Sequence, residues 1–112
     1  MDTWELAALL ARRTAAGQPY LEFIRRPSLS AGLYVLAPGE VDRQQPHTED
    51  EVYYVVSGAG RVTVGDETRD VTAGSVIFVA ATIPHHFHDI VDRLEIVVFF
   101  APPEGSLAVA QG

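Results

Sequence analysis

The alternation of hydrophobic and polar residues predicts one helix followed by a series of short β-strands. Among the first ten residues, three leucines recur at helical spacing. They predict a helix from about Thr3 to about Arg13, with Asp2 as its cap and Gly17 ending any continuation. One side of this helix is apolar, so we expect it to pack against the rest of the protein.

From residue 20 onward, short runs rich in Val, Ile, Tyr and Phe are separated by turn residues, as is typical of strands. Gly65-Asp66 has the glycine first, as a type II′ hairpin turn requires, and Gly58-Ala59-Gly60 predicts a second tight connection. Seven or eight strands with frequent turns indicate a closed barrel or a jelly roll. The predicted strands are Tyr20–Arg26, Ala31–Ala37, Glu51–Ser57, Arg61–Val64, Glu67–Val71, Val76–Ala80, His85–Ile90 and Leu94–Phe100.

The chain of 112 residues has the usual size of one domain, and no linker, repeat or low-complexity block divides it. We expect the helix and its connector in residues 1–19, the barrel in residues 20–101 and a C-terminal tail in residues 102–112. The fold class predicted is therefore all-β with a short N-terminal helix.

Composition narrows the function classes. Eight basic and fifteen acidic residues give a net charge of -7, which disfavours nucleic acid and anionic membranes as partners. The N-terminus does not resemble a secretory signal, and no apolar run approaches the roughly 20 residues that span a bilayer, so we expect a cytoplasmic protein. The absence of cysteine excludes disulfides and thiolate metal sites. Any metal must therefore be bound by histidine, carboxylate or amide groups.

The first of two histidine-containing segments precedes and enters a predicted strand. Alternate side chains of an extended chain share a face. Gln45, His47 and Glu51 can therefore face one side, and Tyr53 and Val55 would continue that face inward. Two of these three are imidazole or carboxylate groups, which suit iron, manganese, nickel, copper and zinc.

The second segment contains the other three histidines. His85, Phe87 and Asp89 are expected on one face, and His86 and His88 on the opposite face. Combined with the first segment, this gives two histidines and one carboxylate. Such a set with open positions is used by non-haem iron oxygenases.

The stretch from Gly39 to Gly58 resembles the first sequence motif of the cupins. Gly39, His47, Glu51 and Gly58 fall in register with that motif, while Gln45 stands at its first histidine position. A second motif follows downstream, and the resemblance as a whole covers about residues 20–100. It implies the cupin double-stranded β-helix, a jelly-roll barrel.

The stretch from Gly74 to Asp89 is similar to the second cupin motif. Gly74 and His85 are in register, whereas Ala80, Thr82 and Asp89 replace the proline, glycine and asparagine of the motif. Cupins bind one metal inside the barrel through the histidines and the glutamate of these motifs.

Carried over to this chain, the resemblance implies one divalent transition metal (Fe, Mn, Ni, Cu or Zn) on His47, Glu51 and His85. Gln45 would be a fourth ligand, or would hydrogen-bond a bound water or substrate. Tyr53 is a candidate acid or substrate-orienting group. The implied function is a small metalloenzyme acting on a small organic molecule, with dioxygenase-like chemistry favoured. A non-catalytic module that binds or senses a metabolite or metal is the alternative, and a metal-independent isomerase or epimerase with a histidine base is the third.

Each candidate also has a structural interpretation. His47 and Glu51 could be solvated, and His85 could be a turn residue, but their place in the motifs favours metal ligation. His86 and His88 are interpreted as packing or interface residues. Glu49 and Asp50 are expected to be solvated charges.

The resemblance also implies a homodimer, since small cupins commonly pair. The apolar residues between Trp4 and Leu10 are one predicted contact. The outward set Val52, Tyr54 and Val56 is the other.

Overall fold

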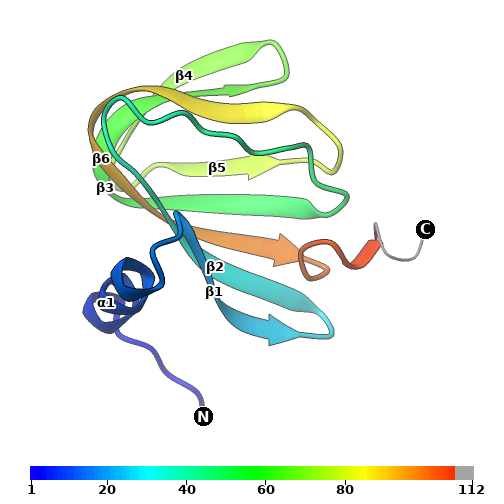
Figure 1. Ribbon diagram of the computed structural model, residues 1–112. Coiled ribbons are helices and arrows are strands. Elements are labelled where there is room, and N and C mark those ends of the chain that lie inside the picture. Colours follow the sequence, from blue (N-terminus) through cyan, green and yellow to red (C-terminus); the bar gives the residue numbers. More distant parts are fainter. Residues whose placement is uncertain (108–112) are drawn as a thin grey trace.

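The computed structural model describes residues 1–107 and shows one antiparallel sheet that curls into a barrel, with a helix outside it (Figure 1). The strand order is β1-β2-β6-β3-β4, and β5 pairs with β3. The prediction of an all-β fold with an N-terminal helix is confirmed. The elements are α1 (Leu6–Ala16), β1 (Tyr20–Arg26), β2 (Leu29–Leu36), β3 (Asp50–Val64), β4 (Glu67–Thr72), β5 (Val76–Val79) and β6 (His85–Ala101).

Two long strands, β3 and β6, organise the barrel. The first half of β3 pairs with β5 and with the second half of β6, and its second half pairs with β4 and with the first half of β6. Each of these long strands was predicted as two shorter ones. The tight connection predicted at 58–60 is wrong, because these residues lie within β3.

Gly58 explains why β3 continues there. It has a φ of 99°, and a Cβ at this position would overlap the backbone of Arg93 and Leu94 on the neighbouring strand. The register of β3 with β6 shifts between Val55 and Arg61. Glycine therefore allows the strand to bend at a close backbone approach, where the sequence pattern suggested a turn.

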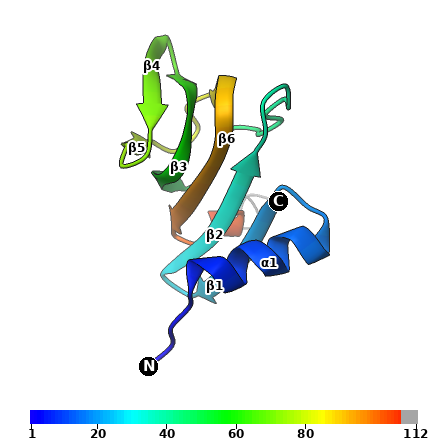
Figure 2. The ribbon, with the colours of Figure 1, turned by 90° about the vertical axis from the view of Figure 1, so that its left-hand side faces the viewer.

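Helix α1 packs against the outer face of β1 and β2 (Figure 2). Its buried Leu9 joins Leu33 and Val35 in a small apolar cluster, which confirms that the helix docks through its leucines. The helix begins at Leu6, later than predicted, and the predicted capping by Asp2 is wrong because Glu5 occupies the N-cap position. Asp2 lies before the helix and pairs with Arg26 at 2.9 Å.

The main core fills the barrel interior. Tyr53 and Val55 point inward from β3, and His85 and Phe87 point inward from β6, as the alternation predicted. The other members of this core are Tyr34, Leu36, Val62, Val71, Val79, Leu94, Ile96, Val98 and Phe100. The inward carboxylate and imidazole of the candidate site thus lie on the same strand faces as the core.

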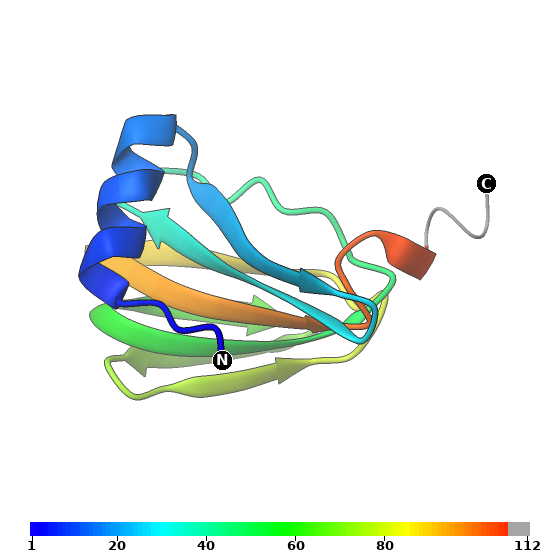
Figure 3. The same ribbon diagram turned by 90° about the horizontal axis from the view of Figure 1, so that it is seen from below.

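After β6 the chain folds back in a turn, residues 102–107, beside the tip of the β1–β2 hairpin (Figure 3). Pro103 is buried, and Arg25 and Ser30 hydrogen-bond the backbone of Glu104. These residues were predicted as part of a tail, of which residues 108–112 lie outside the described residues. Within residues 1–107, no helix is long and apolar enough to cross a membrane.

Candidate metal centre

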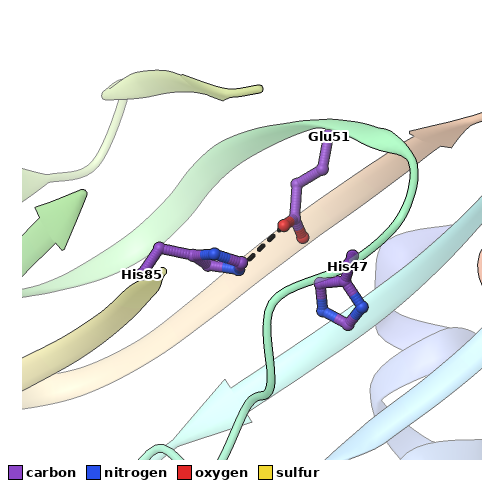
Figure 4. A group of neighbouring side chains, drawn as sticks. All are labelled: His47, Glu51 and His85. Atoms are coloured by element: carbon purple, nitrogen blue, oxygen red, sulfur yellow. Dashed lines mark ion pairs between the residues drawn. The ribbon is translucent and has the colours of Figure 1, made fainter. Parts of the chain in front are cut away.

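The structure brings His47, Glu51 and His85 together, as the motifs implied (Figure 4). His47 lies on the irregular segment before β3, Glu51 is the second residue of β3, and His85 is the first residue of β6. One candidate ligand atom from each lies within 4.8 Å of the others. Glu51 and His85 are not neighbours in the sheet, because Glu51 pairs with Val79 and Phe100 while His85 pairs with Val64. Both face inward, so they meet across the interior of the barrel, and the loop that carries His47 reaches the same point.

Glu51 and His85 form the buried part of the site, each with a side chain that is 1% exposed. The Nε2 of His85 lies 2.8 Å from Oε1 of Glu51. Neither atom has a hydrogen-bond partner of acceptable geometry within residues 1–107. Buried polar atoms normally have such partners, so this pair is an exception that needs an explanation.

The tautomer of His85 supplies that explanation. Its Nδ1 lies 2.9 Å from the carbonyl oxygen of Ile83, which can only accept, so Nδ1 is the protonated nitrogen. In the neutral ring, Nε2 then presents a lone pair beside the lone pairs of Glu51. Two lone pairs at this separation repel each other, so a positive charge is needed between them: a proton on Nε2 gives the ion pair drawn in Figure 4, and a metal ion can take the place of that proton. The donor set therefore fits a divalent metal, with imidazole and carboxylate as its ligands.

The electrostatics of His85 are consistent with this. Burial opposes a charged ring, but the Glu51 carboxylate and the Ile83 carbonyl outweigh it and raise the pKa of His85. The site therefore favours a positive charge at Nε2, from either a proton or a metal ion.

Gln44, and not its neighbour, is the amide at the site. The predicted residue, Gln45, is exposed. The Oε1 of Gln44 accepts a hydrogen bond from the Tyr53 hydroxyl at 2.8 Å and lies 3.4 Å from Nε2 of His47. Strand parity does not apply here, because residues 40–47 are not in a strand.

Asp42 holds Gln44 in this position. The spacing of residues in the sequence gave no indication that Asp42 belongs to the site. Its buried carboxylate accepts hydrogen bonds from the backbone and side-chain amides of Gln44 at 3.2 and 3.0 Å. It also accepts from the Tyr34 hydroxyl at 2.6 Å and from the Phe87 backbone at 2.8 Å. One carboxylate thus links the loop, β2 and β6 around the site.

Tyr53 is fully buried, with its ring edge-to-face against Phe87 at 4.9 Å. Burial, reinforced by the charge of Glu51, raises the pKa of Tyr53 well above its usual value. The hydroxyl is therefore protonated at any physiological pH, and its proton is donated to Gln44.

The prediction that Glu49 is a solvated charge is wrong. Glu49 is 2% exposed, and its carboxylate accepts hydrogen bonds from the backbone of Gly105 at 2.7 Å and of Leu107 at 3.0 Å, and from the Thr48 hydroxyl. Its burial depends on the turn that packs over it after β6. Asp50 is exposed as predicted, and it accepts a hydrogen bond from the backbone of Ala81 at 2.8 Å.

The outward histidines take no part in the cluster. His86 is exposed, and the half-buried His88 contacts Thr63 and Asp89. Asp89 was expected to face inward with His85 and Phe87, but it is exposed and has a φ of 49°. This left-handed conformation, which aspartate tolerates, interrupts the alternation of β6.

A cavity of about 450 Å³ opens beside the cluster, with His47 in its wall. Tyr20 crosses to this cavity over Gly32, where any Cβ would overlap the tyrosine ring. The Tyr20 hydroxyl is buried and has no hydrogen-bond partner in the part of the chain that the structure describes. The other residues of the wall are Pro19, Tyr34, Leu36, Glu40, Val41, Arg43, Gln44, Val98, Phe100 and Glu104.

Comparison with known proteins agrees with the fold. The family model for the cupin domain matches residues 32–100. The uncharacterized protein SCO3923 of Streptomyces coelicolor is 47% identical over 104 residues, which cover 93% of this chain and 99% of that protein.

Among solved structures, TT1209 from Thermus thermophilus matches with a TM-score of 0.72 and 27% identity, over 92% of this chain and 99% of that chain. Salicylate 1,2-dioxygenase from Pseudoaminobacter salicylatoxidans, in adducts with gentisate, matches with a TM-score of 0.71 and 19% identity. That match covers 88% of this chain but 32% of the dioxygenase. At that identity it shows a common fold alone.

Proposed function

The chain belongs to the cupin family, and on that premise we propose that it binds one divalent transition metal through His47, Glu51 and His85. The observation that carries the proposal is the convergence of His47 on the buried ion pair of Glu51 and His85. One candidate ligand atom from each of the three residues lies within 4.8 Å of the others, and the facing atoms of the pair are 2.8 Å apart. A metal ion would satisfy both atoms and the nearby imidazole of His47.

We further propose that the protein is a metalloenzyme that acts on a small organic molecule in the adjoining cavity, with dioxygenase-like chemistry. A metal on two imidazoles and one carboxylate, with free coordination positions, supplies Lewis acidity or dioxygen activation. The dioxygenase of similar fold is consistent with this chemistry, although it is similar in fold alone.

The chain's own residues would orient the substrate. The cavity volume of about 450 Å³ suits a small organic ligand, and aromatic and aliphatic side chains form much of its wall. The unpartnered hydroxyl of Tyr20 would donate a hydrogen bond to an acceptor on that ligand. Arg43 in the same wall would pair with a carboxylate or phenolate group of the ligand, and Glu40 and Glu104 would accept hydrogen bonds from its donor groups.

Metal content is the first measurement. We expect near-stoichiometric iron, manganese, nickel, copper or zinc in the reloaded parent protein, measured by plasma mass spectrometry. His47→Ala and His85→Ala should each lose it, because each removes one of three ligands. His86→Ala is the matched control, since it removes an exposed histidine next to His85 that faces the other side of β6. A parent without metal after reloading, or equal loss in all three variants, would contradict the site.

Catalysis is tested separately. Dioxygen consumption by the metal-loaded protein should appear with at least one phenolic, keto-acid or thiol substrate, and Tyr20→Phe should raise KM without altering metal content. No turnover across these classes would favour the alternative, a non-catalytic binding or sensing module. The burial of Glu51 and His85 favours that alternative, because only His47 of the three lines the cavity. Activity that survives a chelator would instead indicate a metal-independent isomerase or epimerase.

We also propose that two copies pair through the outer face of β3, β5 and β6. On this face Val52 lies between Phe78 and Phe99, and Tyr54 lies between Val76 and Val97, in cross-strand register. Phe78, Val76, Tyr54 and Phe99 are exposed by 60%, 66%, 45% and 42%. A contiguous apolar surface of this kind is typical of a protein contact.

A further inference from the structure

The turn after β6 places a carboxylate on the outer side of His47. The Oε2 of Glu104 lies 3.6 Å from Nδ1 of His47. The other ring nitrogen, Nε2, lies 3.4 Å from Oε1 of Gln44, which is hydrogen-bonded to the buried Tyr53. The two nitrogens of His47 therefore face different acceptors, one on the C-terminal turn and one on the buried side of the site.

Backbone hydrogen bonds fix this turn independently of the Glu104 side chain. Glu104 donates its N–H to Ser30 Oγ at 2.9 Å and accepts from Arg25 through its carbonyl at 3.0 Å. On the other side, Glu49 accepts the N–H groups of Gly105 and Leu107. Glu104 is thus held beside His47 by contacts from β1, from β2 and from Glu49 just before β3, all of them distant in the sequence.

We propose that Glu104 is a positioning residue for His47, which accepts the Nδ1–H and so leaves Nε2 unprotonated and free for the metal. The inference rests on the proposed metal-binding function. Metal-bound histidines usually donate their other N–H to a carboxylate, a carbonyl or a water, and this partner fixes both tautomer and ring orientation. The present 3.6 Å is longer than a formed hydrogen bond, whereas the 3.4 Å contact of Nε2 with Gln44 is within hydrogen-bond distance, so the proposed contact requires His47 or Glu104 to move closer when the metal binds.

Gln44 is the competing acceptor. If His47 carried its proton on Nε2, that proton would point toward the Gln44 amide oxygen and would block the metal. A carboxylate accepts a hydrogen bond more strongly than a neutral amide does, so Glu104 favours the tautomer that the metal requires. Removing the charge should shift the ring toward Gln44.

The test uses Glu104→Ala and Glu104→Gln in the full chain, with Glu67→Ala as control. Glu67 lies on the β4 hairpin with a side chain that is 72% exposed, and its replacement causes the same change in net charge. Glu104→Ala keeps the backbone hydrogen bonds of the turn, so the fold should persist. The measurements are the tautomer of His47 in the metal-free protein, by long-range ¹H–¹⁵N NMR, the Kd for Zn²⁺, and the visible spectrum with Co²⁺.

We expect the proton on Nδ1 in the parent and in Glu67→Ala, and a shift toward Nε2 in Glu104→Ala. The Zn²⁺ affinity should fall by about 10–100-fold in Glu104→Ala, with an altered Co²⁺ spectrum. Glu104→Gln should restore part of the affinity, because its amide oxygen can still accept.

An Nε2-protonated His47 in the parent would overturn the inference. So would a Glu104→Ala protein with the parent's Kd, Co²⁺ spectrum and tautomer. A parent that binds no Zn²⁺ would overturn the proposed metal site itself. The tautomer is measured without metal, so it tests the contact between Glu104 and His47 separately from metal binding.

Discussion

Glu49 offers a quantitative test of how the C-terminal turn is attached. In Glu49→Ala the turn loses two charge-assisted hydrogen bonds, from the N–H groups of Gly105 and Leu107, and Thr48 loses its partner. Hydrogen bonds to charged groups contribute roughly 1.5–3 kcal/mol each. The two amides are in a half-buried turn that water can reach after the change, so the lower value applies. We expect a loss of about 3 kcal/mol in the free energy of unfolding.

Glu49→Gln should cost about half as much, since it keeps one acceptor oxygen while its amide group faces the other N–H. For a domain of this size, 1 kcal/mol corresponds to roughly 4 °C in Tm. The melting temperature should therefore fall by about 12 °C in the alanine variant and about 6 °C in the glutamine variant.

The assay is urea and thermal unfolding of the metal-free protein, followed by far-ultraviolet circular dichroism. Glu67→Ala is the control and should change stability by less than about 0.5 kcal/mol, because its side chain is exposed. A loss below about 1 kcal/mol in Glu49→Ala would refute the reasoning. It would mean that the turn is held by its other contacts, and that the burial of Glu49 contributes little.

Three further predictions concern the barrel and its outer face. Thr82 has a φ of 70° and an exposed side chain, so Thr82→Gly should stabilise the protein by about 0.5–1 kcal/mol in urea unfolding, since relief of strain exceeds the added chain entropy. Gly58→Ala should lower the free energy of unfolding by about 3 kcal/mol or more in the same assay, because the new Cβ would overlap the backbone of β6 and the residue has a positive φ. An unchanged unfolding midpoint would disprove the close approach. Phe78→Glu should convert a dimer to a monomer in sedimentation at micromolar concentration, and a monomeric parent would contradict the proposed pairing.

Local sequence patterns were sufficient to predict the barrel and to predict which residues of its two long strands face inward. Alternation has a period of two along any strand, so Glu51, Tyr53, His85 and Phe87 could be assigned to the interior before any strand pairing was known. His47 does not lie in a strand, so its assignment to the metal site required the resemblance to the cupin motifs. The structure brings His47 close to Glu51 and His85.

Residues outside regular strands could not be placed in this way. Parity favoured Gln45, but the irregular loop presents Gln44 instead, and Asp42 orients it through contacts with β2 and β6. The same limit applies to Gly58, where a turn and a tight bend within a strand have the same sequence pattern. What distinguishes the bend from a turn is the close approach of the Arg93 backbone, which comes from a distant part of the chain.

The sequence thus specified which groups can bind a metal and on which faces of their strands they lie, because these depend on residue type and local geometry. Tertiary packing specified which other groups surround them. Glu49 is buried and Glu104 faces His47 only because the turn after β6 folds back on the barrel. No periodicity relates two segments that lie so far apart in the sequence, so contacts between them arise from the three-dimensional fold.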